Sequence, residues 1–339
     1  MKKTAIVILN YNGSKFLKQF LPGVIYKTIE IADVWVADNC STDDSVSILQ
    51  NEFPQINLIV NKENSGYAGG YNEALKQLDY KYFLLLNSDI EVADNWVQPL
   101  EELMDSDENI AACQPKILSY LEPEKFEYAG SAGGFIDKYG YPFCRGRLFL
   151  SLEEDNGQYD DVQEVFWASG ACMMVRADLF KQYNGFDADF FAHMEEIDYC
   201  WRMKNYGFKI MVCPSSKVYH IGGGTLSKKS SKKTYLNFRN NFSLLYKNLP
   251  DNQLVKVFIV RLLLDGVAGI KFLLQGGFAD TIAVLRAHLY FYKNYGKLRE
   301  KRHQLKQQEV NKIYKRNIVF DYYILRKTKF SELNKEDFS

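Results

Sequence analysis

The first 120 residues alternate short, fully apolar runs with segments in which apolar residues recur every three or four positions. The apolar runs are rich in Val, Ile and Leu and predict buried β-strands. These strands are expected at Thr4–Leu9, Val34–Ala37, Leu58–Val60 and Phe83–Leu86. The intervening segments predict helices at Phe16–Tyr26, Asp44–Glu52 and Gly70–Leu78. This alternation predicts an α/β fold with a mostly parallel central sheet flanked by helices, whose ligands bind at the carboxyl ends of the strands.

The pattern changes after residue 120. Residues 120–165 are rich in Gly, Tyr and acidic residues and predict an excursion loop or a small hairpin. The expected elements that follow are a strand-like run over 165–175 broken by Gly170, helices at Ala177–Tyr183 and Glu195–Tyr206, strands at Lys209–Cys213 and Lys217–Tyr219, and helices from Tyr235 to about Arg316.

The chain shows one low-complexity patch, the Ser/Lys stretch 227–233, which is the expected domain boundary. We expect a catalytic domain over 1–226, with a nucleotide-binding half (1–120) and an acceptor half (121–226). A C-terminal helical extension over 227–339 would follow it.

Composition agrees with a globular protein that has an ample core, since 47% of the 339 residues are hydrophobic and 25% are charged. The zero net charge conceals an asymmetry. Residues 1–200 hold 33 Asp and Glu against 15 Lys and Arg, whereas residues 201–339 hold 9 against 27. A basic tail behind an acidic body suggests an anionic surface for the tail. No nucleic-acid recognition motif accompanies these basic residues, so we expect no nucleic-acid partner.

Other features indicate a cytoplasmic protein. The six cysteines form no CxxC pair, and Met1-Lys2-Lys3 runs straight into the first strand without a secretory signal. No stretch reaches the roughly 20 uncharged apolar residues that span a bilayer. The apolar stretch Leu254 to Tyr295, with the aromatic and basic residues that follow it, predicts peripheral attachment to an anionic inner membrane face. The alternative is that these helices pack on the catalytic domain or on a second copy of the chain, in a homo-oligomer.

Polar side chains end the first two predicted strands. Asn10-Tyr11-Asn12 closes the first, where it would wrap a nucleotide base with Tyr11 against the ring, or simply form a turn. Asp38 closes the second, and a carboxylate there can accept a hydrogen bond from the imide N–H of uracil or thymine.

The third and fourth strands also end in polar residues. Residues 63–72, with Asn64, Gly66 and Asn72, predict either a phosphate-cradling loop that enters a helix or a tight turn. Asn87-Ser88-Asp89 places two oxygen ligands two positions apart at the end of a buried strand. That arrangement suits Mg²⁺ or Mn²⁺ and a bound diphosphate.

Candidate catalytic residues lie further along the chain. Glu195-Glu196-Ile197-Asp198 opens a helix beside apolar residues, and burial would raise a carboxyl pKa into the range of a general base. Acidic residues in a first helical turn also complement the helix dipole, which is the structural alternative. Asp198 pairs with Arg202 at i,i+4 and is expected to orient the site. His220, before a glycine-rich turn, is a candidate third metal ligand.

The acceptor is expected near Trp167 and Gly170. Trp167 is placed to stack on a sugar face, and core packing is an equal alternative.

In this order, the motifs over about residues 4–248 resemble the family 2 glycosyltransferases of GT-A fold, in particular the bacterial rhamnosyltransferase-like branch. The resemblance implies a hexosyltransferase-type enzyme that transfers a sugar, rhamnose for that branch, with inversion. The donor would be a UDP- or dTDP-sugar and the acceptor a glycan or lipid-linked hydroxyl, in cell-surface polysaccharide synthesis. It implies that Asn10, Asn12, Asp38, Asn64, Gly66 and Asn72 contact the nucleotide, that Asn87, Asp89 and His220 bind the metal, and that Glu196 of the Glu195–Glu196 pair is the base.

Two positions depart from the family pattern. Asn87 replaces the first acid of D-x-D, which would shift coordination towards Asp89 and His220, and the base is Glu instead of Asp. The departures leave a degenerate, non-catalytic scaffold as one alternative. A sugar-nucleotide nucleotidylyltransferase is another, although such an enzyme needs a Gly-rich basic loop after the first strand, where this chain has Asn10-Tyr11-Asn12-Gly13.

Overall fold

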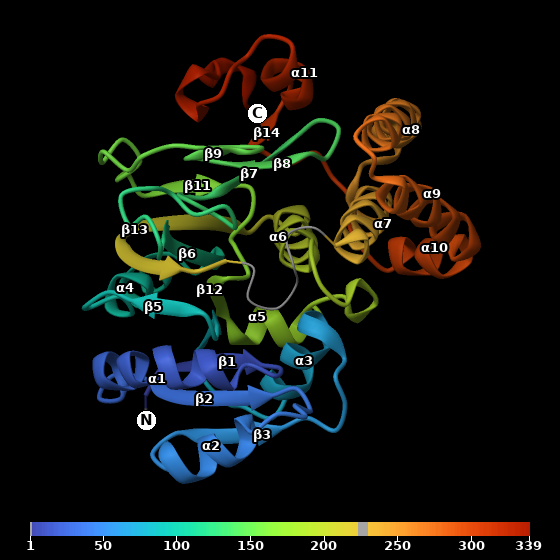
Figure 1. The fold of residues 1–339 in the computed structure, drawn as a ribbon. Coiled ribbons are helices and arrows are strands. Elements are labelled where there is room, and N and C mark those ends of the chain that lie inside the picture. Colours follow the sequence, from blue (N-terminus) through green and yellow to red (C-terminus); the bar gives the residue numbers. More distant parts are fainter. Residues whose placement is uncertain (1, 223–229) are drawn as a thin grey trace.

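The computed structural model describes residues 2–222 and 230–339 (Figure 1). A nine-stranded sheet forms its centre. The strands of this sheet are β1 (Thr4–Asn10), β2 (Asp33–Asp38), β3 (Asn57–Val60), β4 (Tyr82–Asn87), β5 (Ile90–Val92), β6 (Ile110–Ser119), β11 (Gln163–Val165), β12 (Cys172–Arg176) and β13 (Lys209–His220). Their order is β11-β13-β6-β12-β4-β1-β2-β3, and β5 pairs with β13.

The strands β1 to β4 form the parallel half of this sheet. β1 lies between β2 and β4 and is parallel to both. Its side chains alternate between two cores, with Ala5 and Val7 on one face and Ile6 and Ile8 on the other. Because both faces are buried, these strands are apolar at nearly every position. The four predicted strands are confirmed to within one residue at each end.

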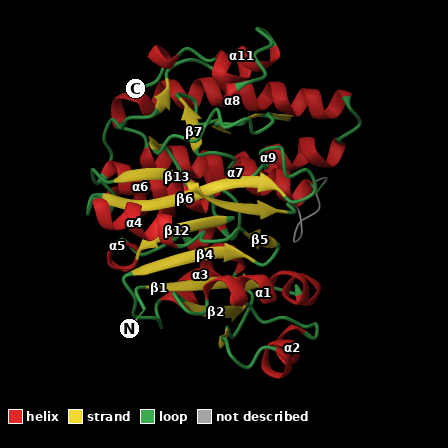
Figure 2. Ribbon diagram, turned by 90° about the vertical axis from the view of Figure 1, so that its left-hand side faces the viewer, coloured by secondary structure: helices red, strands yellow, loops and turns green. Residues whose placement is uncertain are grey.

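Helices cover both faces of the sheet (Figure 2). One core contains side chains of α1 (Ser14–Thr28), α2 (Ser45–Glu52) and α4 (Gln98–Ser106). The other contains side chains of α3 (Gly66–Leu75), α5 (Ala177–Gln182) and α6 (Glu195–Asn205). The predicted helices are confirmed, although α3 begins four residues earlier than its pattern indicated.

The second half of the sheet is mixed. β12 is antiparallel to both β4 and β6, whereas β6 and β13 are parallel. The prediction of separate strands over 209–213 and 217–219 was wrong, because β13 continues through a register shift between Cys213 and Lys217. Pro214 in this interval has no N–H to donate, and an irregularity in the pairing accommodates it.

A second, five-stranded sheet occupies residues that the sequence suggested were a loop or hairpin. Its strands, in the order β10-β9-β8-β7-β14, are β7 (Gly134–Asp137), β8 (Pro142–Cys144), β9 (Arg147–Leu148), β10 (Ser151–Leu152) and β14 (Ile313–Tyr314). β14 pairs in parallel with β7, so the C-terminal part of the chain completes this sheet.

The C-terminal helices are α7 (Ser231–Asn248), α8 (Asp251–Leu274), α9 (Phe278–Lys293), α10 (Tyr295–His303) and α11 (Ile318–Tyr323). The expected helical pattern to Arg316 was wrong beyond His303, where β14 and its flanking loops begin. Within residues 2–222 and 230–339, no helix is long and apolar enough to cross a bilayer. The proposed boundary at 226/227 lies outside the described residues, and the division into domains stays a prediction.

Candidate active site at the strand ends

The carboxyl ends of β1 and β2 form a closed hydrogen-bonded turn. Asn10 Nδ2 donates to Asp38 Oδ2 at 2.9 Å, and the Ser41 backbone N–H and hydroxyl donate to the two Asp38 oxygens at 2.8 and 2.7 Å. Asp38 is fully buried, so its carboxylate orders this turn. Asn10 Oδ1 is buried without a hydrogen-bond partner among the described residues. Gly13 lies against this oxygen, since a Cβ there would be 2.4 Å from it.

The next residues shape the rim of the same turn. Tyr11 is exposed, as a residue that stacks on a base must be. Asn12 has a left-handed backbone with φ 51°, and its Oδ1 accepts from the Thr42 backbone N–H at 2.7 Å. The amide of Asn12 therefore ties the β1 turn to the loop after β2.

The loop before α3 is held by internal contacts. Asn64 Oδ1 accepts from Asn39 Nδ2 and from the Gly66 backbone N–H, both at 3.0 Å. Gly66 has φ 76°, and a Cβ there would lie 2.4 Å from the Phe191 carbonyl oxygen. That carbonyl accepts from the backbone N–H of Tyr67 at 2.6 Å. The start of α3 thus binds a backbone carbonyl in this structure, which agrees with the tight-turn alternative.

Asn72 also bonds to the chain itself. Its Nδ2 donates to the Phe186 carbonyl at 2.7 Å, and its Oδ1 accepts from the Phe186 N–H at 3.0 Å. Both amide atoms hold the segment that leads to α6. The predicted ribose and diphosphate contacts of Asn64, Gly66 and Asn72 stay predictions.

The turn between β4 and β5 meets the end of β13, because β5 pairs with β13. His220 Nε2 lies 3.1 Å from Asp89 Oδ1, although 131 positions separate them in the chain. On the other side of the ring, His220 Nδ1 lies 3.2 Å from Glu127 Oε2. Burial lowers the pKa of His220, but its contacts with Asp89 and Glu127 outweigh burial and raise that pKa to about 10. The imidazole is therefore held between two carboxylates.

The donor set fits a divalent metal in its chemistry. Asp89, in the turn before β5, supplies a carboxylate oxygen, and His220 of the paired strand β13 supplies an imidazole nitrogen once a metal displaces its proton. Asn87 ends β4 and Ser88 follows it, and both are half-buried. Residues 2–222 and 230–339 contain no ready cluster of three His, Cys, Asp or Glu side chains around one point. A metal at this position would therefore need further ligands from an amide, a substrate or water.

The loop before α6 has an unusual backbone. Phe191, His193 and Met194 have φ values of 63°, 71° and 73°, a left-handed conformation that is costly for residues with side chains. Asn240 of α7 stabilises this loop, because its Nδ2 lies within 2.7–2.9 Å of the carbonyls of Phe190, Ala192 and His193.

The first two residues of α6 are acids, of which Glu195 is buried and Glu196 is half-buried. Oε2 of Glu195 and Oε2 of Glu196 have no hydrogen-bond partner among the described residues. Burial raises the pKa of Glu196 to about 7. Hydrogen bonds from backbone N–H groups at the start of α6 oppose this effect and lower the pKa, but burial outweighs them. Burial and then the charge of Glu196 raise the pKa of Glu195. A carboxyl with this pKa is matched to general-base chemistry at neutral pH.

Asp198 has a different environment. Its carboxylate accepts from Arg202 Nε, Lys247 Nζ and Asn248 Nδ2, each at 2.9 Å. Although burial opposes it, the charges of Lys247 and Arg202 lower the pKa of Asp198. The group is an anchor between α6 and α7, in agreement with the orienting role expected of it.

A sequence comparison identifies the family. A family model described as glycosyl transferase family 2 matches residues 5–183, more than half of the chain. The chain belongs to glycosyltransferase family 2. The hexosyltransferase Agl10 of Haloferax volcanii, named for low-salt glycan biosynthesis, is 27% identical over 247 residues, which are 70% of this chain and 74% of that protein. An N-acetylglucosaminyl-diphospho-decaprenol L-rhamnosyltransferase of Mycobacterium tuberculosis is 24% identical over 63% of this chain and 75% of its own.

Solved structures confirm the GT-A fold class for this glycosyltransferase. GalNAc-T7 with UDP, GalNAc and Mn²⁺ superimposes with a TM-score of 0.57 at 15% identity, over 74% of this chain and 49% of that one. TarS of S. aureus in complex with UDP-GlcNAc gives a TM-score of 0.55 at 16% identity, over 85% of this chain and 79% of that one.

The predicted acceptor residues of the glycosyltransferase lie in a packed region. Trp167 is 4% exposed, and its Nε1 donates to the Phe135 carbonyl at 2.9 Å, which corresponds to the core-packing alternative. Gly170 is buried, and its carbonyl accepts from the Tyr67 hydroxyl. A Cβ at Gly170 would lie 2.8 Å from that hydroxyl oxygen, so the position needs glycine for this close approach.

Three residues of the site were missed by sequence reasoning. Glu127 contacts His220 but lies in the aperiodic segment after residue 120. Tyr67 links α3 to Gly170, and Asn240 holds the loop before α6 from a helix in the C-terminal extension. A lone side chain in an irregular segment gives no periodic signal.

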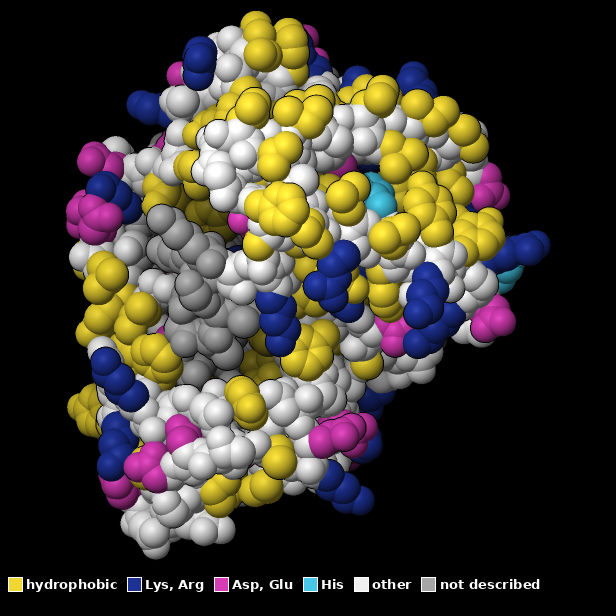
Figure 3. Space-filling view, turned by 45° about the vertical axis from the view of Figure 1, so that its right-hand side comes forward, with side chains coloured by type: hydrophobic (Ala, Val, Ile, Leu, Met, Phe, Trp, Pro, Cys, Tyr) yellow, Lys and Arg dark blue, Asp and Glu magenta, His cyan; other side chains and the backbone are white. Residues whose placement is uncertain are grey.

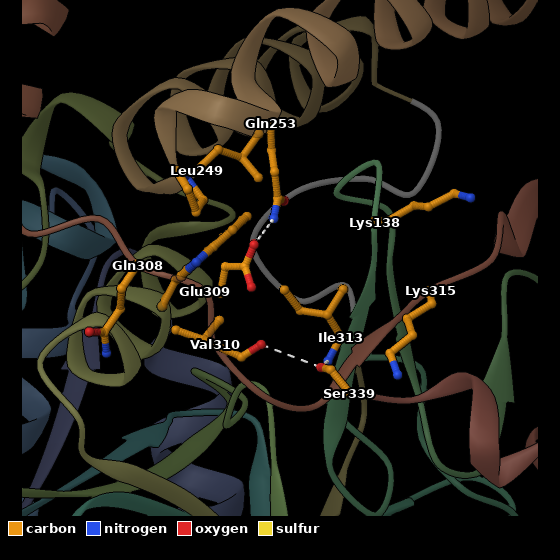
Figure 4. Close-up of a pocket in the computed structure, with 11 residues that line it drawn as sticks. Lys138, Leu249, Gln253, Gln308, Glu309, Val310, Ile313, Lys315 and Ser339 are labelled. Carbon is orange, nitrogen blue, oxygen red and sulfur yellow. Dashed lines mark hydrogen bonds between the residues drawn. The ribbon is translucent and has the colours of Figure 1, made fainter.

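A pocket of about 250 Å³ lies elsewhere, between the start of α8 and the C-terminal segment (Figure 4). Gln253 Nε2 donates to Glu309 Oε1 across it at 3.2 Å, and Ser339 Oγ donates to the Val310 carbonyl at 3.3 Å. None of the predicted site residues lines this pocket. The candidate active site at the strand ends is therefore separate from this pocket.

Proposed function

We propose that this glycosyltransferase moves a sugar, rhamnose by the names of its relatives, from a UDP- or dTDP-sugar to a hydroxyl of a glycan or lipid-linked acceptor. The reaction inverts the anomeric carbon and serves cell-surface polysaccharide synthesis. One observation carries the proposal. Glu196 combines a buried carboxylate oxygen that has no partner among the described residues with a pKa of about 7, in a family 2 chain whose Asp89 and His220 lie 3.1 Å apart.

The chemistry assigned to the chain is a single displacement. Glu196 accepts the proton of the acceptor hydroxyl while that oxygen forms its bond to the anomeric carbon. The bond from that carbon to the diphosphate oxygen breaks at the same time, and the nucleoside diphosphate leaves with the electron pair. Burial and the charge of Glu196 both raise the pKa of Glu195, so they oppose the ionisation of Glu195 beside Glu196.

The remaining site residues have proposed roles in holding the donor. Asp89 and His220, with Asn87, would hold Mg²⁺ or Mn²⁺, which would supply positive charge beside the departing diphosphate. Asn10 Oδ1 is available to accept a hydrogen bond from the base, and Tyr11 is exposed for stacking. Relatives of the chain include structures with UDP and Mn²⁺, which supports a nucleotide donor and a divalent ion.

Replacing Glu196 by Gln tests the proposed base. The amide keeps the size of the side chain but cannot take a proton, so transfer should fall by about two or more orders of magnitude, the usual contribution of a general base. Donor affinity measured by calorimetry with Mn²⁺ should stay within about twofold of the unsubstituted enzyme. Asp189→Asn, an acid outside the proposed site, is the control. Transfer by E196Q at the rate of the control would contradict the assignment.

We also infer that the C-terminal helices attach the enzyme to the inner face of the cell membrane. In α8 the amphipathic pattern is inverted. Its buried stripe is Val257, Arg261, Asp265 and Gly269, and Arg261 Nη2 pairs with Asp265 Oδ1 at 3.1 Å. Apolar residues point outward instead, which is the reverse of a helix that faces water.

These outward residues form what we call the apolar face. On α8 they are Val255, Ile259, Leu262, Leu263, Val267, Ile270, Leu273 and Leu274, and on α9 they are Phe278, Ile282, Leu285, Leu289 and Tyr292. Figure 3 shows hydrophobic side chains gathered over these helices, with Lys and Arg among them. Contiguous apolar surface of this kind marks an interaction site.

Charge favours a membrane over a second copy as the partner of the apolar face. Its exposed charged neighbours include Lys256, Lys271, Arg286 and Lys293. Anionic lipid headgroups would neutralise these cations. If a second copy of the chain bound the apolar face instead, these cations of one copy would lie against the same cations of the other. We call these four residues the cationic fringe.

A further inference from the structure

Arg147 is a buried cation on β9. Arg147 is 6% exposed, and its guanidinium lies 4.3 Å from the centre of the Tyr128 ring. Transferring a charge out of water is expensive unless an opposite charge or several hydrogen bonds compensate it.

Few groups in the structure compensate the buried positive charge of Arg147. No carboxylate of the described residues lies within ion-pair distance of it, and residues 223–229 contain no acid. Its Nη1 donates to the Phe149 carbonyl at 3.2 Å and its Nη2 to Cys144 Sγ at 3.6 Å, while Nε is buried without an acceptor among the described residues.

Other buried arginines show how this chain compensates the same group. Arg145, two positions earlier, pairs with Asp161 Oδ1 at 2.8 Å. Arg176 has no carboxylate partner, but its Nε and Nη2 donate to three backbone carbonyls, those of Met104, Asp107 and Ile110. Arg147 has one carbonyl and one weakly accepting sulfur.

Arg147 also lies beside the site of glycosyl transfer. The Tyr128 ring, on which its guanidinium stacks, belongs to the residue after Glu127. Glu127 Oε2 in turn lies 3.2 Å from His220 Nδ1. The guanidinium is therefore one residue away from the contact between Glu127 and His220.

We propose that Arg147 is the fixed cation of a phosphate-binding site next to the site of glycosyl transfer. The ligand is a phosphate or diphosphate group, because the planar guanidinium presents paired N–H donors that match phosphate oxygens. This identification rests on the proposed function, in which the charged groups of both substrates are phosphates. The phosphate belongs either to the acceptor or to the donor.

Inorganic pyrophosphate in EDTA tests the site without metal and without turnover. Calorimetric titration should give at least tenfold weaker binding for Arg147→Met than for the unsubstituted enzyme. Arg147→Lys should lie between them, because it keeps the charge and loses the paired donors. Arg145→Met is the matched control, since its guanidinium is equally buried but already paired, and it should bind pyrophosphate normally. Equal affinity of R147M, R147K and the unsubstituted enzyme would overturn the proposal.

A second titration, with UDP and Mn²⁺, identifies the source of the phosphate. A loss in R147M that is confined to metal-free pyrophosphate assigns the site to a phosphate on the acceptor, whereas a loss that extends to UDP assigns it to the donor. E196Q should bind pyrophosphate normally, so failure of the general-base assignment would leave this titration unchanged.

Thermal unfolding supplies a readout that a merely structural arginine would not give. Without ligand, R147M should unfold at the same temperature as the unsubstituted enzyme or higher, because it removes an uncompensated buried charge. R145M should unfold at a lower temperature, because it removes a paired one. Pyrophosphate should raise the unfolding temperature of R145M and leave that of R147M unchanged. Destabilisation of R147M equal to that of R145M, with the same pyrophosphate shift, would contradict the proposal.

Discussion

Glu196 and Asp198 lie two positions apart in the same helical turn and have opposite properties. Burial dominates for Glu196, whose Oε2 has no partner among the described residues, so its pKa rises to about 7. Asp198 is fully buried, but Lys247 and Arg202 lower its pKa. The protein thus separates a carboxyl that can exchange a proton from one that holds the helix in place.

The raised pKa of Glu196 predicts the pH dependence of transfer. A general base must be deprotonated, so kcat/KM should rise about tenfold per pH unit at low pH and level off above about pH 7. Because Glu195 and Glu196 interact, the midpoint belongs to the pair. Initial rates between pH 5 and 9 check this, with enzyme stability confirmed at each pH. A flat profile between pH 5 and 7 would remove Glu196 from the role of base.

The side chains that sequence reasoning found are those at the ends of regular strands. Asp89 and His220 could be singled out because each follows an apolar strand pattern at the edge where ligands bind. They come together because β5, which begins directly after Asp89, pairs with β13. Glu127 and Arg147 could not, because they lie in the irregular segment whose small sheet has no periodic signal. Nor could Asn72 be distinguished from a ligand contact, since an asparagine that clamps the Phe186 backbone has the same sequence context as one that binds a nucleotide.

At the scale of elements, α6 and α7 form a unit that positions the base. Asp198 of α6 bonds to Lys247 and Asn248 of α7, and Asn240 of α7 holds the carbonyls of the loop before α6. The helix that carries Glu196 is therefore fixed at both ends of its first turn by α7. The extension that the sequence set apart from the catalytic domain contributes to the geometry of the active site.

The Asp198 contacts predict a large stability change. Asp198→Asn removes the charge and leaves Lys247 and Arg202 buried, so the free energy of unfolding should fall by about 3–5 kcal/mol. Lys297→Met, which breaks an exposed pair with Asp189, should cost about 0–1 kcal/mol and is the control. Urea unfolding followed by circular dichroism measures both.

The same variant gives a pH test with a defined sign. The pKa of Asp198 is lower in the folded state than the ordinary 3.8, so its contribution is present above that value and is lost as the pH falls further. The difference between D198N and the unsubstituted protein should therefore shrink below about pH 4. A cost for D198N no larger than for K297M would show that the buried contacts do not stabilise the α6–α7 unit.

Two elements show where prediction from sequence stops. β13 was expected as two strands, because Pro214 normally ends strand pairing, yet β6 continues alongside it after a register shift. β14 has only two residues, and its pairing with β7 joins positions more than 170 apart. A strand so short has no pattern of its own, and its existence depends on a sheet edge built by a distant segment.

At the scale of the whole molecule, the apolar face and the active site belong to one connected structure. α8 to α10 follow α7, which holds the base loop, and β14 returns the chain to the second sheet beside α11 (Figure 1). Lys271 at the end of α8 lies 4.3 Å from the Tyr323 ring of α11, so the two helices are in contact. A membrane bound to the apolar face of α8 and α9 would therefore lie at a fixed distance from the active site.

Flotation with vesicles tests the apolar face. The double variant Leu263→Gln/Ile270→Gln replaces two exposed residues of α8, whose side chains are each worth about 1.5–3 kcal/mol when buried, so the partition coefficient should fall at least tenfold. The control Leu121→Gln/Leu150→Gln removes two equally exposed leucines outside these helices and should bind normally. Binding of the unsubstituted protein should need anionic lipid and weaken with salt, because the cationic fringe contributes electrostatic attraction that ions screen. If the protein instead sediments as a dimer that L263Q/I270Q converts to monomers, without any binding to anionic vesicles at low salt, the apolar face joins two copies of the chain, and the membrane proposal is wrong.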